Sequence, residues 1–139
     1  MKILFIGQLK ASGYFQYLAL KKINKDVDII DTNNFFFRRN FFKKFFYNIS
    51  PELLAPFINY SILKKIKNEY DLIYVTSVEY ISKKLIFELK KKTKKIICFL
   101  EDNPFAKRDK KRWDLYIKSA KFFDLTVAFQ RSRISMGKK

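Results

Sequence analysis

The sequence predicts an α/β fold: one Rossmann-like, doubly wound domain with a mainly parallel sheet of about five strands flanked by helices. Five short runs rich in β-branched and aromatic residues recur along the 139 residues. Four of them are almost continuously apolar, which is typical of strands covered on both faces of a parallel sheet. Segments of helical periodicity separate the runs. Because no repeat or glycine-rich linker divides the chain, residues 1–139 are expected to form a single domain.

The expected strands follow from these apolar runs. They are Lys2–Gly7, Val27–Asp31, Asp71–Thr76, Lys95–Leu100 and Asp124–Ala128. The first helix is predicted over Tyr14–Ile23, where Phe15, Leu18, Ala19 and Lys22 have helical spacing. Strand and helix thus alternate from the start of the chain, and this order predicts right-handed crossovers between parallel strands.

Three further helices are predicted by their caps and apolar spacing. Ser50 followed by Pro51 and Glu52 marks a helix start, and that helix is expected to reach Tyr70, with Pro56 kinking it or delaying its start. The segment Ser82–Lys92 presents Leu85, Ile86 and Leu89 on one face. The last helix is expected over Asp109–Phe123, with Trp113, Ile117 and Ala120 aligned.

Composition excludes several classes of function. The chain has no His and a single Cys98, so an internal disulfide, the common zinc sites and histidine-based catalysis are excluded, and no metal or cofactor is expected in this chain. The 30 Lys and Arg against 13 Asp and Glu give a charge of +17, which favours nucleic acid, anionic lipid or phosphate as partners. No signal peptide or long apolar run is present, so a cytoplasmic protein is expected.

Two loops that follow expected strands carry candidate chemistry. The loop from Gly7 to Gly13 matches neither the dinucleotide fingerprint nor a P-loop; its glycines either serve a tight turn or bring helix N–H groups to an anion. Glu101 and Asp102 come directly before Asn103 and Pro104, so these carboxylates either act on a ligand as hydroxyl acceptors or base, or belong to an ordinary turn. No acidic pair follows the first strand, and this argues against a receiver domain.

The segment NNFFFRRNFFKKFFY is the least ordinary stretch of the chain. At helical spacing its aromatic residues fall on a broad arc bordered by cations, which is typical of a helix that meets an anionic membrane or a partner protein. The alternative is that the arc packs onto the sheet. The residues expected at such a membrane or partner surface are Phe37, Arg38, Arg39, Phe41, Lys43, Lys44 and Phe45.

The series MKILFIG, DVDIID, DLIYVTSVEYIS, KIICFLEDNPF and DLTVAF resembles, in order and spacing, the N-terminal half of bacterial GT-B glycosyltransferases of the CgeB-like group. The resemblance extends from Met1 to about Ile134, and the turn Asp102-Asn103-Pro104-Phe105 is its most specific motif. The chain departs from the family in having Glu101-Asp102-Asn103 where paired aspartates more often precede the proline.

The resemblance implies the acceptor side of sugar transfer. In such enzymes the second domain binds the nucleotide-sugar donor, and this chain has no room for that domain. The implied partners are therefore a separately encoded donor half and a sugar-containing acceptor. A nucleotide-sugar is implied only when that half is supplied, and activity of this chain alone is left open. The implied acceptor-binding residues are Gly7, Gln8, Ser12, Gly13, Glu79 and Asn103, and the candidate catalytic residues are Asp102 and Glu101.

Two other classes of function stay open. The first is a non-enzymatic basic module that binds an anionic membrane surface or nucleic acid through its charge. The lysine runs are dispersed and accompany no nucleic-acid-binding motif, so a membrane surface, at the inner face of the membrane, is the better-supported partner. The second is a Rossmann-like domain for another nucleotide or metabolite.

Overall fold

The computed structural model describes residues 1–35, 51–109 and 111–128. Five parallel strands form one sheet: β1 (Ile3–Gly7), β2 (Val27–Asp31), β3 (Tyr70–Val75), β4 (Thr93–Leu100) and β5 (Leu125–Ala128). Their order in the sheet is β2-β1-β3-β4-β5, and every neighbouring pair is parallel. The predicted α/β, Rossmann-like class is therefore confirmed.

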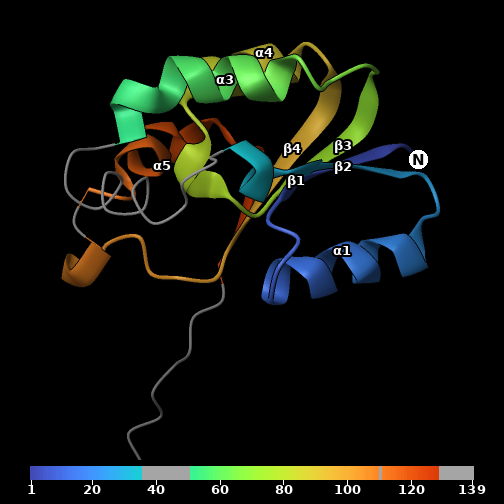
Figure 1. The fold of residues 1–139 in the computed structure, drawn as a ribbon. Coiled ribbons are helices and arrows are strands. Elements are labelled where there is room, and N and C mark those ends of the chain that lie inside the picture. Colours follow the sequence, from blue (N-terminus) through green and yellow to red (C-terminus); the bar gives the residue numbers. More distant parts are fainter. Residues whose placement is uncertain (36–50, 110, 129–139) are drawn as a thin grey trace, which may run out of the picture.

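Helices cover the sheet on both sides. Helix α1 (Ser12–Ile23) lies on one face, and α3 (Ala55–Leu63), α4 (Lys83–Lys90) and α5 (Asp114–Ser119) lie on the other (Figure 1). The strand order reverses between β1 and β3. The first crossover places β2 on one side of β1, and the later crossovers add β3, β4 and β5 on the other side. In such sheets this reversal marks the place where ligands bind, at the carboxyl ends of the strands.

The larger core lies between the sheet and helices α3, α4 and α5. Alternate residues of β1, β3 and β4 point into it, and Leu85, Ile86 and Leu89 of α4 meet them, as their spacing predicted. On the other face Phe5 stacks on Tyr74, with ring centroids 6.0 Å apart, and contacts Tyr17 of α1. Phe15, one of the residues whose helical spacing predicted this helix, is 70% exposed.

Two predicted helices are shorter than their periodicity suggested. The segment expected as one helix from Pro51 to Tyr70 begins as a 3₁₀ turn at Pro51–Leu54 and is α-helical only over Ala55–Leu63. Pro56 stands in the first turn of that helix, where its missing N–H costs nothing, so it delays the start rather than kinking the helix. The expected helix over Asp109–Phe123 is α-helical only over Asp114–Ser119, with 3₁₀ turns before and after it.

Strand β5 differs from the other strands in its exposure. All four of its residues are exposed, although the continuous apolar run predicted cover on both faces. Leu125 pairs with Ile97 and Val127 with Phe99, so these side chains share the face that carries α1. Among the described residues, α1 packs over β1 and β3 and leaves that end of the sheet open.

The turn that leads into α1 brings the backbone of Gln8 close to Gly13, and this contact predicts how substitutions in the turn affect stability. Gly13 is buried in the first helical turn, and a Cβ atom there would lie 2.2 Å from the Gln8 carbonyl oxygen. Because a backbone atom gives way less easily than a side chain, Gly13→Ala is expected to lower the free energy of unfolding by about 1 to 3 kcal/mol. Urea denaturation measures this difference.

The neighbouring residue supplies a control of opposite sign. Ala11 has φ 49°, a conformation that glycine adopts without strain. Ala11→Gly is therefore expected to leave the protein as stable as before or more stable, by up to about 1 kcal/mol. Equal losses in both variants would contradict the close approach of Gly13 to Gln8.

Candidate functional site

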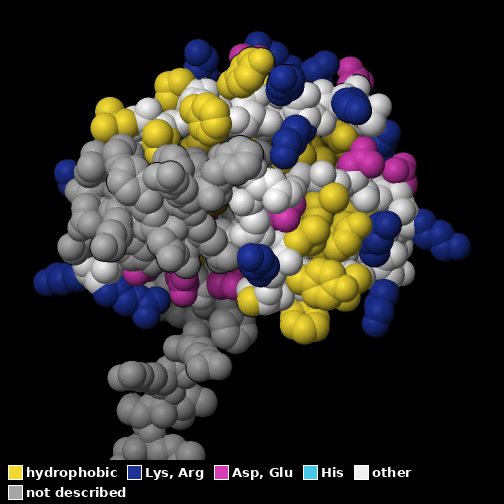
Figure 2. Space-filling view, viewed as in Figure 1, with side chains coloured by type: hydrophobic (Ala, Val, Ile, Leu, Met, Phe, Trp, Pro, Cys, Tyr) yellow, Lys and Arg dark blue, Asp and Glu magenta, His cyan; other side chains and the backbone are white. Residues whose placement is uncertain are grey.

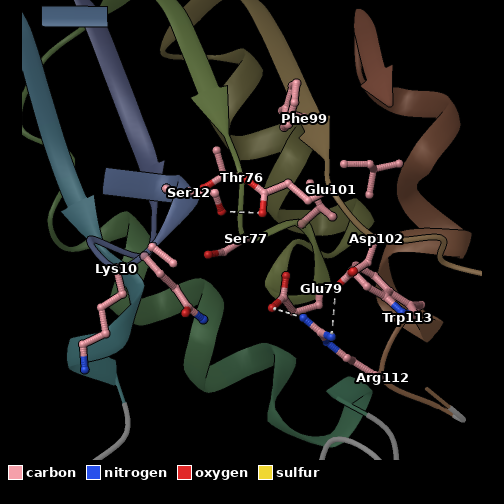
Figure 3. A pocket seen from close by; sticks show the side chains of 15 residues that line it. Lys10, Ser12, Thr76, Ser77, Glu79, Phe99, Glu101, Asp102, Arg112 and Trp113 are labelled. Carbon is pink, nitrogen blue, oxygen red and sulfur yellow. Dashed lines mark hydrogen bonds and ion pairs between the residues drawn. The ribbon is translucent and has the colours of Figure 1, made fainter. Parts of the chain in front are cut away.

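A pocket of about 220 Å³ opens at the carboxyl ends of β1, β3 and β4, where the strand order reverses (Figure 3). Its lining comes from the loop between β1 and α1 with the first residues of α1, the loop after β3, the end of β4 with the turn that follows it, and the residues just before α5. The lining residues are Gln8, Lys10, Ala11, Ser12, Gly13, Thr76, Ser77, Val78, Glu79, Phe99, Leu100, Glu101, Asp102, Arg112 and Trp113. The fold therefore brings together residues from opposite ends of the sequence at the position expected for a ligand.

The carboxylate of Glu101 is held against the first turn of α1. Its Oε2 accepts a hydrogen bond from the Ser12 hydroxyl, and its Oε1 accepts one from Nε2 of Gln16 at 2.5 Å. The Tyr74 hydroxyl in turn donates to Oε1 of Gln16 at 3.1 Å. Burial, followed by the charge of Glu101, raises the pKa of Tyr74, so this phenol stays protonated as a donor. The protein's own carboxylate thus occupies the positive end of α1, which in many α/β proteins receives a phosphate.

A second set of charges borders the same pocket. Nη2 of Arg112 lies 3.3 Å from Oε1 of Glu79, and its Nη1 lies 3.6 Å from Oδ2 of Asp102 (Figure 3). The guanidinium also lies 4.5 Å from the ring centroid of Trp113, which fixes its plane. Asp102 makes a further contact of 3.5 Å with Arg108, but its side chain keeps 43% of its surface exposed. Asp102 is therefore reachable by a ligand, whereas Glu79 is enclosed.

The surroundings of Glu79 shift the pKa of its carboxyl group. Burial raises its pKa above the ordinary value of 4.5, and the nearby Arg112 offsets this effect only in part. Two hydroxyls lie buried next to it in the loops after β2 and β3: Thr32 and Ser77 share a hydrogen bond of 2.8 Å. The inner side of the pocket thus contains buried polar groups, while Glu101 and Asp102 are more exposed and stand at its mouth.

The raised pKa of Glu79 predicts a pH dependence of stability. The folded state binds the Glu79 proton more tightly than the unfolded state does, so its contribution falls as the pH rises above about 4.5. Compared with Glu79→Gln, the wild-type protein should therefore lose stability between pH 4 and pH 7. Urea denaturation of both proteins at several pH values in this range measures the difference, in which the titrations of other groups cancel.

The opposite slope would contradict this account. If the wild-type protein gains stability over Glu79→Gln as the pH rises, the ion pair with Arg112 outweighs the cost of burying the charge.

The structure places most of the predicted site residues at the pocket. Gln8, Ser12, Gly13, Glu79, Glu101 and Asp102 line it. Gly7 lies beneath it, at the end of β1, where a Cβ would come within 2.0 Å of Oγ1 of Thr76; the absence of a side chain leaves room for those of Thr76 and Phe5. The side chain of Asn103 accepts from the Phe105 N–H at 2.9 Å and lines a neighbouring groove. The expected membrane surface, Phe37 to Phe45, lies outside the described residues.

Two residues that matter for the charges at the site, Arg112 in the pocket lining and Gln16 next to it, were not expected there from the sequence. Arg112 belongs to a basic run that reads as a solvated helix face, and only the adjacent Trp113 hints at a fixed position. Gln16 follows Ser12 by one helical turn, so the two face the same way, but nothing in the sequence connects them to Glu101. Thr76 follows β3 directly, which for a parallel sheet is itself a signal of a ligand-facing position.

Metal binding finds no support among the described residues, where no group of three or more Cys, Asp or Glu side chains is placed to hold an ion. Cys98 is buried, and burial raises the pKa of its thiol, so it is not a reactive thiolate. Within the described ranges, no helix has the length and apolar character needed to cross a membrane.

Comparisons with known proteins found no matching family model, no matching curated protein and no matching solved structure.

Proposed function

We propose that this chain is a glycosyltransferase-like protein corresponding to the N-terminal half of a GT-B enzyme, and that its pocket binds the sugar-containing acceptor. The observation that carries the proposal is the pair Glu101 and Asp102, which stand at the pocket mouth where the strand order reverses. Carboxylates are strong hydrogen-bond acceptors, and a sugar offers hydroxyl donors on every side. The order of sequence motifs that resembles the CgeB-like group supports the same reading.

The charge arrangement favours hydroxyl groups over phosphate as the bound chemistry. Glu101 fills the end of α1 that would attract a phosphate, and Glu79 and Asp102 already neutralise Arg112. Lys10 is the remaining cation among the described lining residues. A phosphorylated ligand would therefore meet three carboxylates in a protein whose overall charge is +17.

The two carboxylates at the mouth would have different roles. Glu101 is held by Ser12 and Gln16, so it is suited to orienting an acceptor hydroxyl through its remaining lone pairs. Asp102 is more exposed and has only long contacts to two arginines, so it is suited to taking the proton of the attacking hydroxyl once a donor half supplies the nucleotide-sugar. The donor half, in this proposal, is a separate chain or domain.

The proposal is tested by titrating the purified chain with a panel of methyl glycosides and with the phosphorylated counterparts of the same sugars. Calorimetry or a thermal shift reports binding, because a ligand that binds the folded state raises its melting temperature. We expect at least one neutral methyl glycoside to bind and its phosphorylated counterpart to bind more weakly. Binding of the phosphorylated sugars alone would contradict the proposal and favour a nucleotide or phosphometabolite site.

The alternative function, a basic module for an anionic membrane surface, remains a prediction. Lys and Arg side chains are scattered over the visible face and do not gather into one patch (Figure 2). Retention on anionic vesicles at low salt that persists at moderate salt would favour apolar contacts with the bilayer, since screening removes attraction between dispersed charges. Loss of retention at moderate salt would indicate that the dispersed lysines cause the binding through their charge.

A further inference from the structure

A second hollow adjoins the pocket along the same edge of the sheet. It has a volume of about 1120 Å³ and lies between the end of β4, the turn that follows it, and the end of β5. Its described lining consists of Leu100, Glu101, Asp102, Asn103, Pro104, Phe105, Arg108, Tyr116, Thr126 and Ala128. The first three of these also line the pocket, so the two hollows adjoin at Glu101 and Asp102.

The groove offers an apolar surface beside the polar groups of the pocket. Half of its ten described lining residues are apolar or aromatic, namely Leu100, Pro104, Phe105, Tyr116 and Ala128, and its two carboxylates stand where it meets the pocket. The pocket combines carboxylates, hydroxyls and Arg112 with the side chains of Val78, Phe99, Leu100 and Trp113. A ligand that fills both is therefore expected to have a polar end in the pocket and an apolar group beside Phe105.

The apolar groove is preformed among the described residues. Tyr116 is buried, and its ring packs against Trp113 and Phe123. Phe105 is 76% exposed, yet its backbone N–H is tied to the Asn103 side chain at 2.9 Å. An aromatic side chain held in this exposed position has no described partner for most of its surface, and its burial by a ligand would be favourable.

We propose that the acceptor is a glycoconjugate whose sugar occupies the pocket and whose apolar aglycone lies in this groove. The inference rests on the proposed function and adds the substrate class. The sizes agree with it: 220 Å³ is below the 300 to 1,000 Å³ of ordinary small-molecule sites and suits a single sugar ring, whereas the groove of 1120 Å³ has room for a much larger group. Because both hollows are lined by Glu101 and Asp102, the junction between sugar and aglycone would lie at these carboxylates.

The inference is tested with pairs of glycosides that differ only in the aglycone. For each sugar and anomer of the panel, the affinity of the methyl glycoside is compared with that of the phenyl glycoside. We expect the phenyl compound to bind at least about tenfold more tightly where the methyl compound binds, because its ring leaves water for the groove. Phe105→Ser should remove most of this preference, and Phe105→Leu, which keeps an apolar side chain, should retain most of it.

A matched control and the contrary results make the test specific. Phe57 is 54% exposed on α3 and does not line the groove, so Phe57→Ser should keep the full preference for the phenyl compound. Equal affinity for the two glycosides in the wild-type protein, or an unchanged preference in Phe105→Ser, would overturn the inference and leave the proposed acceptor pocket standing. Binding of neither glycoside in any pair would overturn both.

Discussion

Replacing Ile73 with Ala is expected to lower the free energy of unfolding by about 2 to 5 kcal/mol. Ile73 lies in β3, next to Leu4 of β1 and Ile96 of β4, and none of its side chain is exposed. The substitution removes apolar contacts from the larger core and leaves a cavity between the sheet and helices α3 and α4. Urea denaturation followed by far-UV circular dichroism measures the loss.

Two further variants keep this prediction testable if the alanine protein does not fold. Ile73→Val removes a single methylene and is expected to cost about 0.5 to 1.5 kcal/mol. Ile23→Ala, at a position that is 80% exposed at the end of α1, should change the stability by no more than about 0.5 kcal/mol. Similar small losses at positions 73 and 23 would contradict the core described above.

Replacing Glu101 with Ala is expected to weaken binding of the methyl glycoside by about 10- to 100-fold. The carboxylate can accept hydrogen bonds from the ligand, and a bond to a charged group contributes about 1.5 to 3 kcal/mol. The substitution also frees Ser12 and Gln16, which lose the partner that orders them. Isothermal titration with the glycoside that binds the wild-type protein measures the change.

Glu88→Ala is the matched control for the loss of a carboxylate. Glu88 lies on α4, pairs with Lys91 and lines no part of the pocket. This variant should bind the glycoside as the wild-type protein does, and unfolding curves of both variants check that the fold is kept. Equal binding by wild type and Glu101→Ala would remove Glu101 from the acceptor site.

The sheet could be predicted from the sequence because its signal is local. The run that becomes β1 is buried throughout, those that become β3 and β4 are buried at alternate positions and half-buried between them, and the alternation of the runs with helical segments fits only a few topologies. The helix ends were predicted less well. Apolar periodicity continues past Leu63 to Ile66, which still packs against the core, so the sequence contains no clear stop where α3 ends.

The late start of α5 also depends on contacts that cannot be predicted from the sequence. Asp109 was expected to start the last helix, but its carboxylate is buried and accepts a hydrogen bond from Nε1 of Trp113 at 3.0 Å. Lys107–Asp109 form a 3₁₀ turn, residues 111–113 form a further turn, and the α-helix begins only at Asp114. A single buried side-chain bond thus accompanies the displacement of a predicted boundary by five residues.

The site was predictable in its location and not in its internal contacts. Loops that follow parallel strands meet at one edge, so Ser12, Glu79 and Glu101 could be expected near one another. That Glu101 would be bound by Ser12 and Gln16, and Glu79 enclosed with Arg112, depends on side chains 33 to 89 residues apart in the chain. Such pairs leave no periodic signal in a single sequence.

The most direct test of the acceptor pocket is a titration of the ¹⁵N-labelled chain with the methyl glycoside, followed through its amide signals. We expect the signals of residues 8–13, 76–79 and 100–102 to shift with a common dissociation constant, because these residues surround the pocket. Signals of the loops at the opposite ends of the strands, around Asp26, Asn68 and Lys92, should stay in place. Shifts confined to those opposite loops, or no saturable shift near the pocket for any glycoside, would contradict the account.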